Sequence, residues 1–153
     1  MDAFTLLKND HAEVSAKFKQ LEATGEEDAD TRQQLFNEIK QALDVHAHIE
    51  ETIFYPALKR EAETREITLE ALDEHREIKD LLKQLAGTPP QGNAFDNLCA
   101  DLKRAVEHHV KEEEGEMFPK AQGVLGPQQI DELGTQMEQE KQRQQPQKAA
   151  SAS

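Results

Sequence analysis

The chain has 153 residues, 31 acidic and 18 basic, and its net charge of −13 disfavours nucleic acid as a partner because phosphate backbones would be repelled. Its length suits one domain, and no apolar run approaches the ~20 residues that a membrane span needs. The single cysteine, Cys99, excludes an internal disulfide and a thiolate metal cluster, and it fits a reducing compartment. Asp2 stands where a secretory signal would carry positive charge, so we expect a cytoplasmic protein that does not contact membranes.

Apolar residues recur at helical spacing through most of the chain, and no stretch alternates as a β-strand does. The pattern predicts four main helices, over residues 3–24, 31–61, 65–86 and 94–121. A weaker fifth helix is predicted to begin at Pro127, and from about 139 the polar chain is expected to fray or be disordered. Pro56 and Pro119 lie inside apolar patterns, where each is expected to kink its helix.

The connections between the four main helices are short, which makes successive helices antiparallel. We therefore predict an all-α fold, an up-down antiparallel four-helix bundle with a short extra C-terminal helix and a frayed tail. Residues 1–125 would form the bundle, and residues 126–153 would form the weak helix and the disordered tail.

Each predicted helix places one histidine within its apolar stripe; these residues are His11, His46, His75 and His109. Glu50 and Glu113 follow two of them at i+4, so histidine and glutamate point the same way on the helix. A single core histidine is usually a hydrogen-bonded packing residue, but four with two glutamates need another explanation. Buried ionised carboxylates are costly without an opposite charge, and no lysine or arginine occupies the stripes. A multivalent cation is the simplest compensating charge.

The sequence also repeats itself, which supports a metal site independently of the stripes. Residues 9–21 align with residues 73–85, so that His11 matches His75. The same His-x3-Glu spacing occurs in the second and fourth predicted helices, 63 residues apart. Two such helical hairpins, paired about a pseudo-twofold axis, would supply four imidazoles and two carboxylates. This set predicts two metal ions, each with two nitrogen ligands and bridged by both carboxylates.

The ligand types restrict which metal the site would hold. Structural zinc prefers four ligands, often including thiolates, whereas calcium and magnesium prefer oxygen ligands alone. Mixed imidazole and carboxylate ligands suit iron or manganese. The ferritin-like di-iron pattern uses Glu-x-x-His, so this chain offers more nitrogen than that pattern does.

The chain resembles the hemerythrin-like proteins, the HHE cation-binding domains, over about residues 2–122. The matching segments are Leu6-Leu-Lys-Asn-Asp-His11, His46-Ala-His-Ile-Glu50-Glu-Thr-Ile-Phe-Tyr-Pro56, Glu74-His75 and His109-Val-Lys-Glu-Glu113-Glu-Gly-Glu-Met-Phe-Pro119. The resemblance implies a four-helix bundle with two non-haem iron ions, carboxylate- and oxo- or hydroxo-bridged, that binds O2. By position, it implies the ligands His11, His46, Glu50, His75, His109 and Glu113, with the two glutamates as bridges.

Oxygen-carrying hemerythrins have a second histidine one turn before the position of His75, where this chain has Ala71. A site short of one imidazole favours water, peroxide or an added side-chain ligand. Tyr55 is a candidate for that ligand, although packing beside Pro56 is the favoured interpretation. The hypotheses are therefore binding of O2, peroxide or NO, a di-iron enzyme that decomposes peroxide or handles NO, and an iron- or oxygen-sensing module. None of them requires an obligate protein partner.

Two further pairs of residues lie close to the predicted ligands. His108 also begins a His-x3-Glu motif, with Glu112, but only His109 keeps the Phe-Pro ending in register with the repeat. Glu51 and Glu114 either orient an imidazole or belong to a solvated run of surface charge, and we favour the surface interpretation.

Overall fold

The computed structural model describes residues 1–145, and every regular element in that range is helical. The helices are α1 (Ala3–Glu22), α2 (Ala29–Ile49), α3 (Tyr55–Lys59), α4 (Ala62–Ala86), α5 (Gly92–Glu112), α6 (Phe118–Val124) and α7 (Pro127–Gln144). Two short π-helices, η1 (Glu50–Phe54) and η2 (Glu113–Met117), join α2 to α3 and α5 to α6. The all-helical class predicted from the sequence is confirmed.

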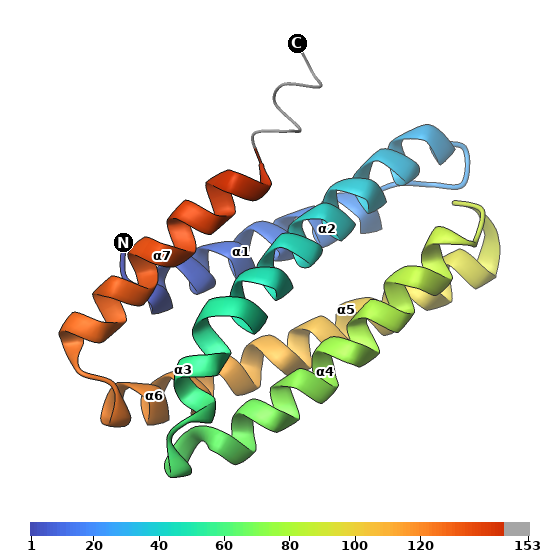
Figure 1. The fold of residues 1–153 in the computed structure, drawn as a ribbon. Coiled ribbons are helices and arrows are strands. Elements are labelled where there is room, and N and C mark those ends of the chain that lie inside the picture. Colours follow the sequence, from blue (N-terminus) through green and yellow to red (C-terminus); the bar gives the residue numbers. More distant parts are fainter. Residues whose placement is uncertain (146–153) are drawn as a thin grey trace.

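The four long helices α1, α2, α4 and α5 lie side by side along the long axis of the molecule (Figure 1). Helix α1 packs against α2, and α4 packs against α5. The turns that join each pair lie at the same end of the molecule, and α3 and α6 lie at the other end. The chain is therefore built as two helical hairpins, which correspond to the two halves of the internal repeat.

Two clusters of buried apolar side chains fill the interior. One includes Leu7, Ile49, Phe54, Leu58 and Met117, and the other includes Val14, Phe18, Ile39, Leu82 and Leu102. On α1 and α4, a buried histidine separates the residues of one cluster from those of the other. The interior thus has a polar layer between two apolar ones, and the histidines lie in that layer.

The kinks expected at Pro56 and Pro119 take the form of the two π-helices. A proline has no N–H to donate, and in an α-helix its ring clashes with the carbonyl four residues earlier. In the wider turn, the N–H of Tyr55 bonds to the carbonyl of Glu50, and that of Phe118 to the carbonyl of Glu113. The chain therefore continues past each proline with an altered helical register, and both changes begin at a predicted ligand.

Helix α7 begins at Pro127 as predicted and packs beside α1 and α2 (Figure 1). Its buried face contributes Ile130, Leu133 and Met137 to the apolar cluster at the end of the molecule that holds α3 and α6. Gly134 lies so close to the start of the chain that an added Cβ would overlap the carbonyl oxygen of Met1. Helix α7, which the sequence predicts as a fifth helix, is therefore an integral part of the packed interior.

The structure continues α7 to Gln144, beyond the position near 139 where the sequence predicts fraying. Two ion pairs in this last part explain the difference, because they tie an otherwise polar segment to α1 and α2. Lys141 lies 2.6 Å from Asp10, and Glu140 lies 3.3 Å from His48. The rest of the predicted tail, from residue 146 onward, falls outside the described residues.

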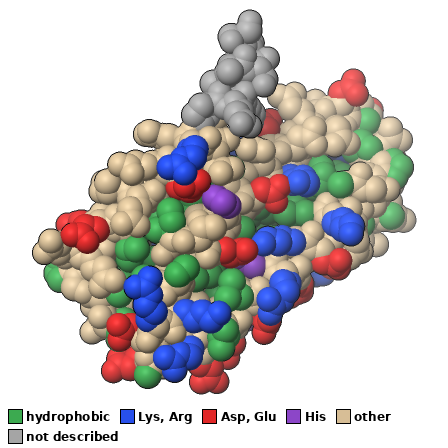
Figure 2. Space-filling model, in the orientation of Figure 1, with side chains coloured by type: hydrophobic (Ala, Val, Ile, Leu, Met, Phe, Trp, Pro, Cys, Tyr) green, Lys and Arg blue, Asp and Glu red, His purple; other side chains and the backbone are tan. Residues whose placement is uncertain are grey.

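Charged side chains of both signs cover the face shown in Figure 2, where little histidine surface is visible. His48 and His108 have side chains that are 39% and 63% exposed, whereas the other four histidines are buried. Among the helices of the described range, none is long and apolar enough to cross a membrane.

Candidate metal centre

The six side chains predicted as ligands meet in the middle of the interior, and all six are buried. They form two overlapping groups, in each of which one possible ligand atom per residue lies within 4.8 Å of the others. The first group is His11 and His46 with Glu50 and Glu113, and the second is His75 and His109 with the same two glutamates. The two halves of the repeat therefore converge on a shared pair of carboxylates.

Each glutamate contacts histidines from both halves. Glu50 Oε1 lies 3.1 Å from His46 Nε2 and 2.9 Å from His75 Nε2. In the same way, Glu113 Oε1 lies 3.0 Å from His11 Nε2, and its Oε2 lies 3.2 Å from His109 Nε2. Both carboxylates thus occupy bridging positions between the two pairs of imidazoles.

The buried charges of the centre strongly perturb one another. Burial acts to raise the pKa of Glu50, but the charge of His46 and nearby hydrogen bonds hold it well below its ordinary value. Burial acts to lower the pKa of His46, but the charge of Glu50 and the hydrogen bond with Asp10 raise it to about 10. Burial also acts to lower the pKa of His109, but the charge of Glu113 and hydrogen bonds with Glu113, Glu50 and Glu74 raise it well above its ordinary value. Protons on His46 and His109 therefore help to balance the buried carboxylates, and a cation can take their place.

Four polar atoms at the centre form no hydrogen bond with the described residues, because the close approaches given above do not have hydrogen-bond geometry; they are His11 Nε2, His46 Nε2, Glu50 Oε2 and Glu113 Oε1. Buried polar atoms are nearly always hydrogen-bonded, so a cluster of unpaired ones needs an explanation. Imidazole nitrogens and carboxylate oxygens that face one another in this way are the donor set of a transition-metal site. The residues present therefore fit a bound cation.

The outward ring nitrogen of every histidine in the centre faces a second carboxylate. The Nδ1 atoms of His11, His46, His75 and His109 lie 2.7, 3.0, 2.7 and 2.7 Å from Glu114, Asp10, Glu51 and Glu74, respectively. A carboxylate that accepts the Nδ1 proton fixes the ring orientation and leaves the Nε2 lone pair free to bind a metal. Each imidazole is thus oriented toward the centre.

The surface interpretation of Glu51 and Glu114 is wrong. Their side chains are only 28% and 35% exposed, and both contact an imidazole of the centre because they come one residue after an inward-facing glutamate. The sequence analysis assigned no role to Asp10 and Glu74, although both lie in the segments that resemble the family. A signal was present, since each directly precedes a site histidine in the repeat, but each contacts the histidine of the following helix.

Tyr55 places its hydroxyl in the second group, which the packing interpretation did not anticipate. The hydroxyl donates a hydrogen bond to Glu113 and lies 3.3 and 3.4 Å from the Nε2 atoms of His75 and His109. On a regular α-helix Tyr55 would lie about 140° around the axis from Glu50, and the wider turn of η1 reduces that angle. Burial and the charges of Glu113 and Glu50 raise the pKa of the phenol well above its ordinary value.

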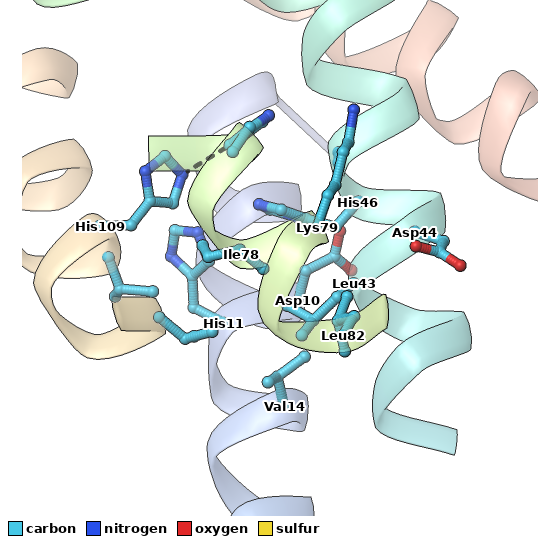
Figure 3. A pocket seen from close by; sticks show the side chains of 14 residues that line it. Asp10, His11, Val14, Leu43, Asp44, His46, Ile78, Lys79, Leu82 and His109 are labelled. Atoms are coloured by element: carbon cyan, nitrogen blue, oxygen red, sulfur yellow. Dashed lines mark hydrogen bonds and ion pairs between the residues drawn. The ribbon is translucent and has the colours of Figure 1, made fainter. Parts of the chain in front are cut away.

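A cavity of about 30 Å³ lies against the four histidines (Figure 3). Its apolar lining includes Val14, Leu43, Ile78, Leu82, Val106 and Val110. A water molecule needs roughly 10–15 Å³ measured in this way, so the cavity has room for a molecule of a few atoms. The centre can therefore receive a small ligand next to mainly apolar side chains.

The sequence model for the hemerythrin HHE cation binding domain matches residues 2–121. The uncharacterized protein Rv2633c of Mycobacterium tuberculosis is 29% identical over 138 residues, which cover 90% of this chain and 83% of that protein. A DNA nickase from Nostoc is 28% identical over 139 residues, which cover 89% of this chain but only 38% of the nickase. The crystal structure of an HHE domain-containing protein from Mycobacterium kansasii, an Rv2633c homolog, has a TM-score of 0.84 and 28% identity, covering 96% of this chain and 89% of that one. This chain belongs to the hemerythrin HHE cation-binding domain family.

Proposed function

We propose that this protein binds two iron ions and uses them to bind dioxygen or a related oxygen or nitrogen species. The observation that carries the proposal is that two fully buried glutamates each contact histidines from both halves of the molecule. Two imidazoles in each group and two shared carboxylates support a pair of ions, and this mixed donor set suits iron or manganese better than structural zinc. The proposed ligands are His11, His46, Glu50, His75, His109 and Glu113.

The four long helices would work as an up-down antiparallel bundle around the metal pair, with residues 1–125 as the metal-binding unit and the chain from 126 as an addition to it. Iron in the centre would supply electrons to a bound ligand, because it exchanges between ferrous and ferric states. The protein's own contribution is to orient the imidazoles through their outer carboxylates and to keep water out with apolar walls. The small cavity selects ligands of a few atoms, such as O2, peroxide or NO.

Metal analysis combined with optical spectra tests the proposal. We expect two iron ions per chain, and a visible spectrum that changes when the reduced protein meets O2, peroxide or NO. His109→Ala should lose iron, because it removes a buried donor. The matched control is His108→Ala, which removes the adjacent exposed histidine and should keep the full metal content. Protein that contains no iron, or equal iron in both variants, would contradict the proposal.

A second candidate function is the decomposition of peroxide by the same centre. Ala71 favours it, because helix α4 of the second group has this alanine where oxygen-carrying hemerythrins have a histidine, and the Tyr55 oxygen lies beside that group. We expect peroxide turnover that falls in Tyr55→Phe and in Ala71→His. Turnover that persists unchanged in both variants would remove this candidate.

We propose no role for this chain on DNA, although one relative is a DNA nickase. The match covers a minor part of that protein, and a net charge of −13 opposes contact with a phosphate backbone. Retention of the protein on immobilised duplex DNA at low salt would contradict this part of the proposal.

A further inference from the structure

Helix α7 lies beyond the residues that match the family, 2–121, yet it reaches the metal centre. Lys141 comes four residues after the buried Met137, so both side chains lie on the face of α7 that packs against α1 and α2. The Lys141 ammonium lies 2.6 Å from Asp10 Oδ1, and the other oxygen of Asp10 lies 3.0 Å from His46 Nδ1. A continuous chain of contacts therefore runs from α7 to a proposed ligand.

This connection belongs to one half of the centre. In the matched half, Glu74 takes the place of Asp10, and its outer oxygen lies 3.3 Å from His108. Within residues 1–145, no lysine forms an ion pair with Glu74, and α7 has no counterpart in the repeat. Within the described residues, helix α7 therefore forms an ion pair with an outer carboxylate of the first group and with none of the second.

The Asp10 side chain is only 8% exposed, but it reaches the lining of a cleft that is open to solvent. Asp10 and Lys141 both line an open cleft of about 390 Å³ between α1, α2 and the end of α7. Without the ammonium, water in this cleft would compete for the carboxylate, and Asp10 would hold the His46 ring less firmly. Lys141 itself is held in place because Met137 is buried and because Glu140 pairs with His48.

We propose that Lys141 is a positioning residue for the first metal position. By fixing the Asp10 carboxylate it sets the orientation of His46, so that α7 strengthens metal binding in the first group and leaves the second group unaffected. The inference rests on the proposed binding of two ions.

The test is the rate at which iron-loaded protein releases each ion to a chelator. Lys141→Met keeps most of the apolar stem and removes the ammonium, and we expect one ion to leave about tenfold faster, the lower end of the range for outer partners of metal ligands. The matched control is Lys79→Met, because Lys79 contacts Glu51 at 2.8 Å and so acts on His75 in the second group. We expect this control to speed the release of the other ion.

Double variants show which carboxylate transmits the effect. If Lys141 acts through Asp10, then Lys141→Met adds nothing to Asp10→Asn but keeps its full effect when combined with Glu74→Gln. Unchanged release in Lys141→Met, or full additivity with Asp10→Asn, would overturn the inference while leaving the two-ion proposal intact. A wild-type protein that binds fewer than two ions would instead overturn the proposed function and this inference with it.

Discussion

At the scale of single residues, each histidine of the centre is held between two carboxylates. His75, for example, has Glu50 2.9 Å from Nε2 and Glu51 2.7 Å from Nδ1. Two successive residues of η1 therefore hold one ring at both nitrogens. The outer carboxylate sets the tautomer, and the inner carboxylate is the one shared between the two groups. This arrangement prepares the imidazole for a metal before any metal binds.

The Tyr55 hydroxyl provides a prediction at this scale. We infer that the phenol is an added ligand of the second group, because its oxygen lies 3.3 and 3.4 Å from the Nε2 atoms of His75 and His109. A phenol bound to ferric iron gives a visible charge-transfer band. Tyr55→Phe is therefore expected to keep two ions but lose that band, as measured by absorption and metal analysis.

The repeat provides the control for this experiment. Phe118 occupies the position of Tyr55 in the other half and carries no hydroxyl, so Phe118→Leu changes packing without changing the donor set. Phe118→Leu should therefore keep the band. A Tyr55→Phe spectrum identical to that of the wild type would show that the phenol does not bind the metal.

The six side chains that meet at the centre could be predicted from the sequence, whereas their surroundings could not. His11, His46, Glu50 and their counterparts were identifiable because polar residues interrupted apolar stripes at repeated spacing. Tyr55 was misjudged because its direction depends on the π-turn, which shifts the helical register. Asp10 was missed because it contacts a histidine on another helix, and such contacts leave no periodic signal.

At the scale of elements, the two π-helices show how one local device serves both halves. Each begins at a bridging glutamate and ends one residue before an aromatic-proline pair. The wider turn removes the clash of the proline with the carbonyl four residues earlier, and it also turns the next aromatic side chain toward the interior. Proline, which usually breaks or kinks an α-helix when it lies in the interior, here marks where the helical register changes.

Helix α7 provides a prediction at the scale of elements. Gly134→Ala would place a methyl group against the backbone of Met1 and Ala3, so α7 must shift. We expect it to destabilise the protein by about 1–3 kcal/mol, as overpacking usually does. Denaturant unfolding measures the change. The control is Gly123→Ala in α6, where an added Cβ meets nothing within 4 Å and should stabilise the protein by up to about 1 kcal/mol.

The extent of α7 shows why helix ends are hard to predict. Its apolar residues end at Met137, so the pattern gave no reason for the helix to continue. The last turns are instead held by Lys141 on Asp10 and Glu140 on His48, which are contacts between distant parts of the chain. If Gly134→Ala has the same free energy of unfolding as the wild type, then the close approach of Gly134 to the start of the chain does not fix the position of α7.

At the scale of the whole molecule, the centre places ionisable groups between two apolar clusters in a protein that already carries a net charge of −13. Without a metal, protonated imidazoles must balance the buried carboxylates. With a metal, the cation does so, because it binds neutral imidazole and ionised carboxylate. Protons and metal therefore compete for the same sites, which links metal binding, stability and pH.

This competition gives a final prediction for thermal unfolding. The pKa of His46 is about 10 in the folded metal-free protein against 6.5 ordinarily, so its stabilising effect is complete below pH 6.5 and is lost as the pH rises through about 10. The pKa of Glu50 is instead depressed, so its effect is present above pH 4.5 and is lost as the pH falls. Metal-free protein should therefore lose stability as the pH rises from 6.5 toward 10, whereas iron-bound protein should not. We expect the difference in Tm between the two forms to widen across that window, as measured by calorimetry with and without chelator. A difference that stays constant or narrows with rising pH would mean that no metal replaces these protons.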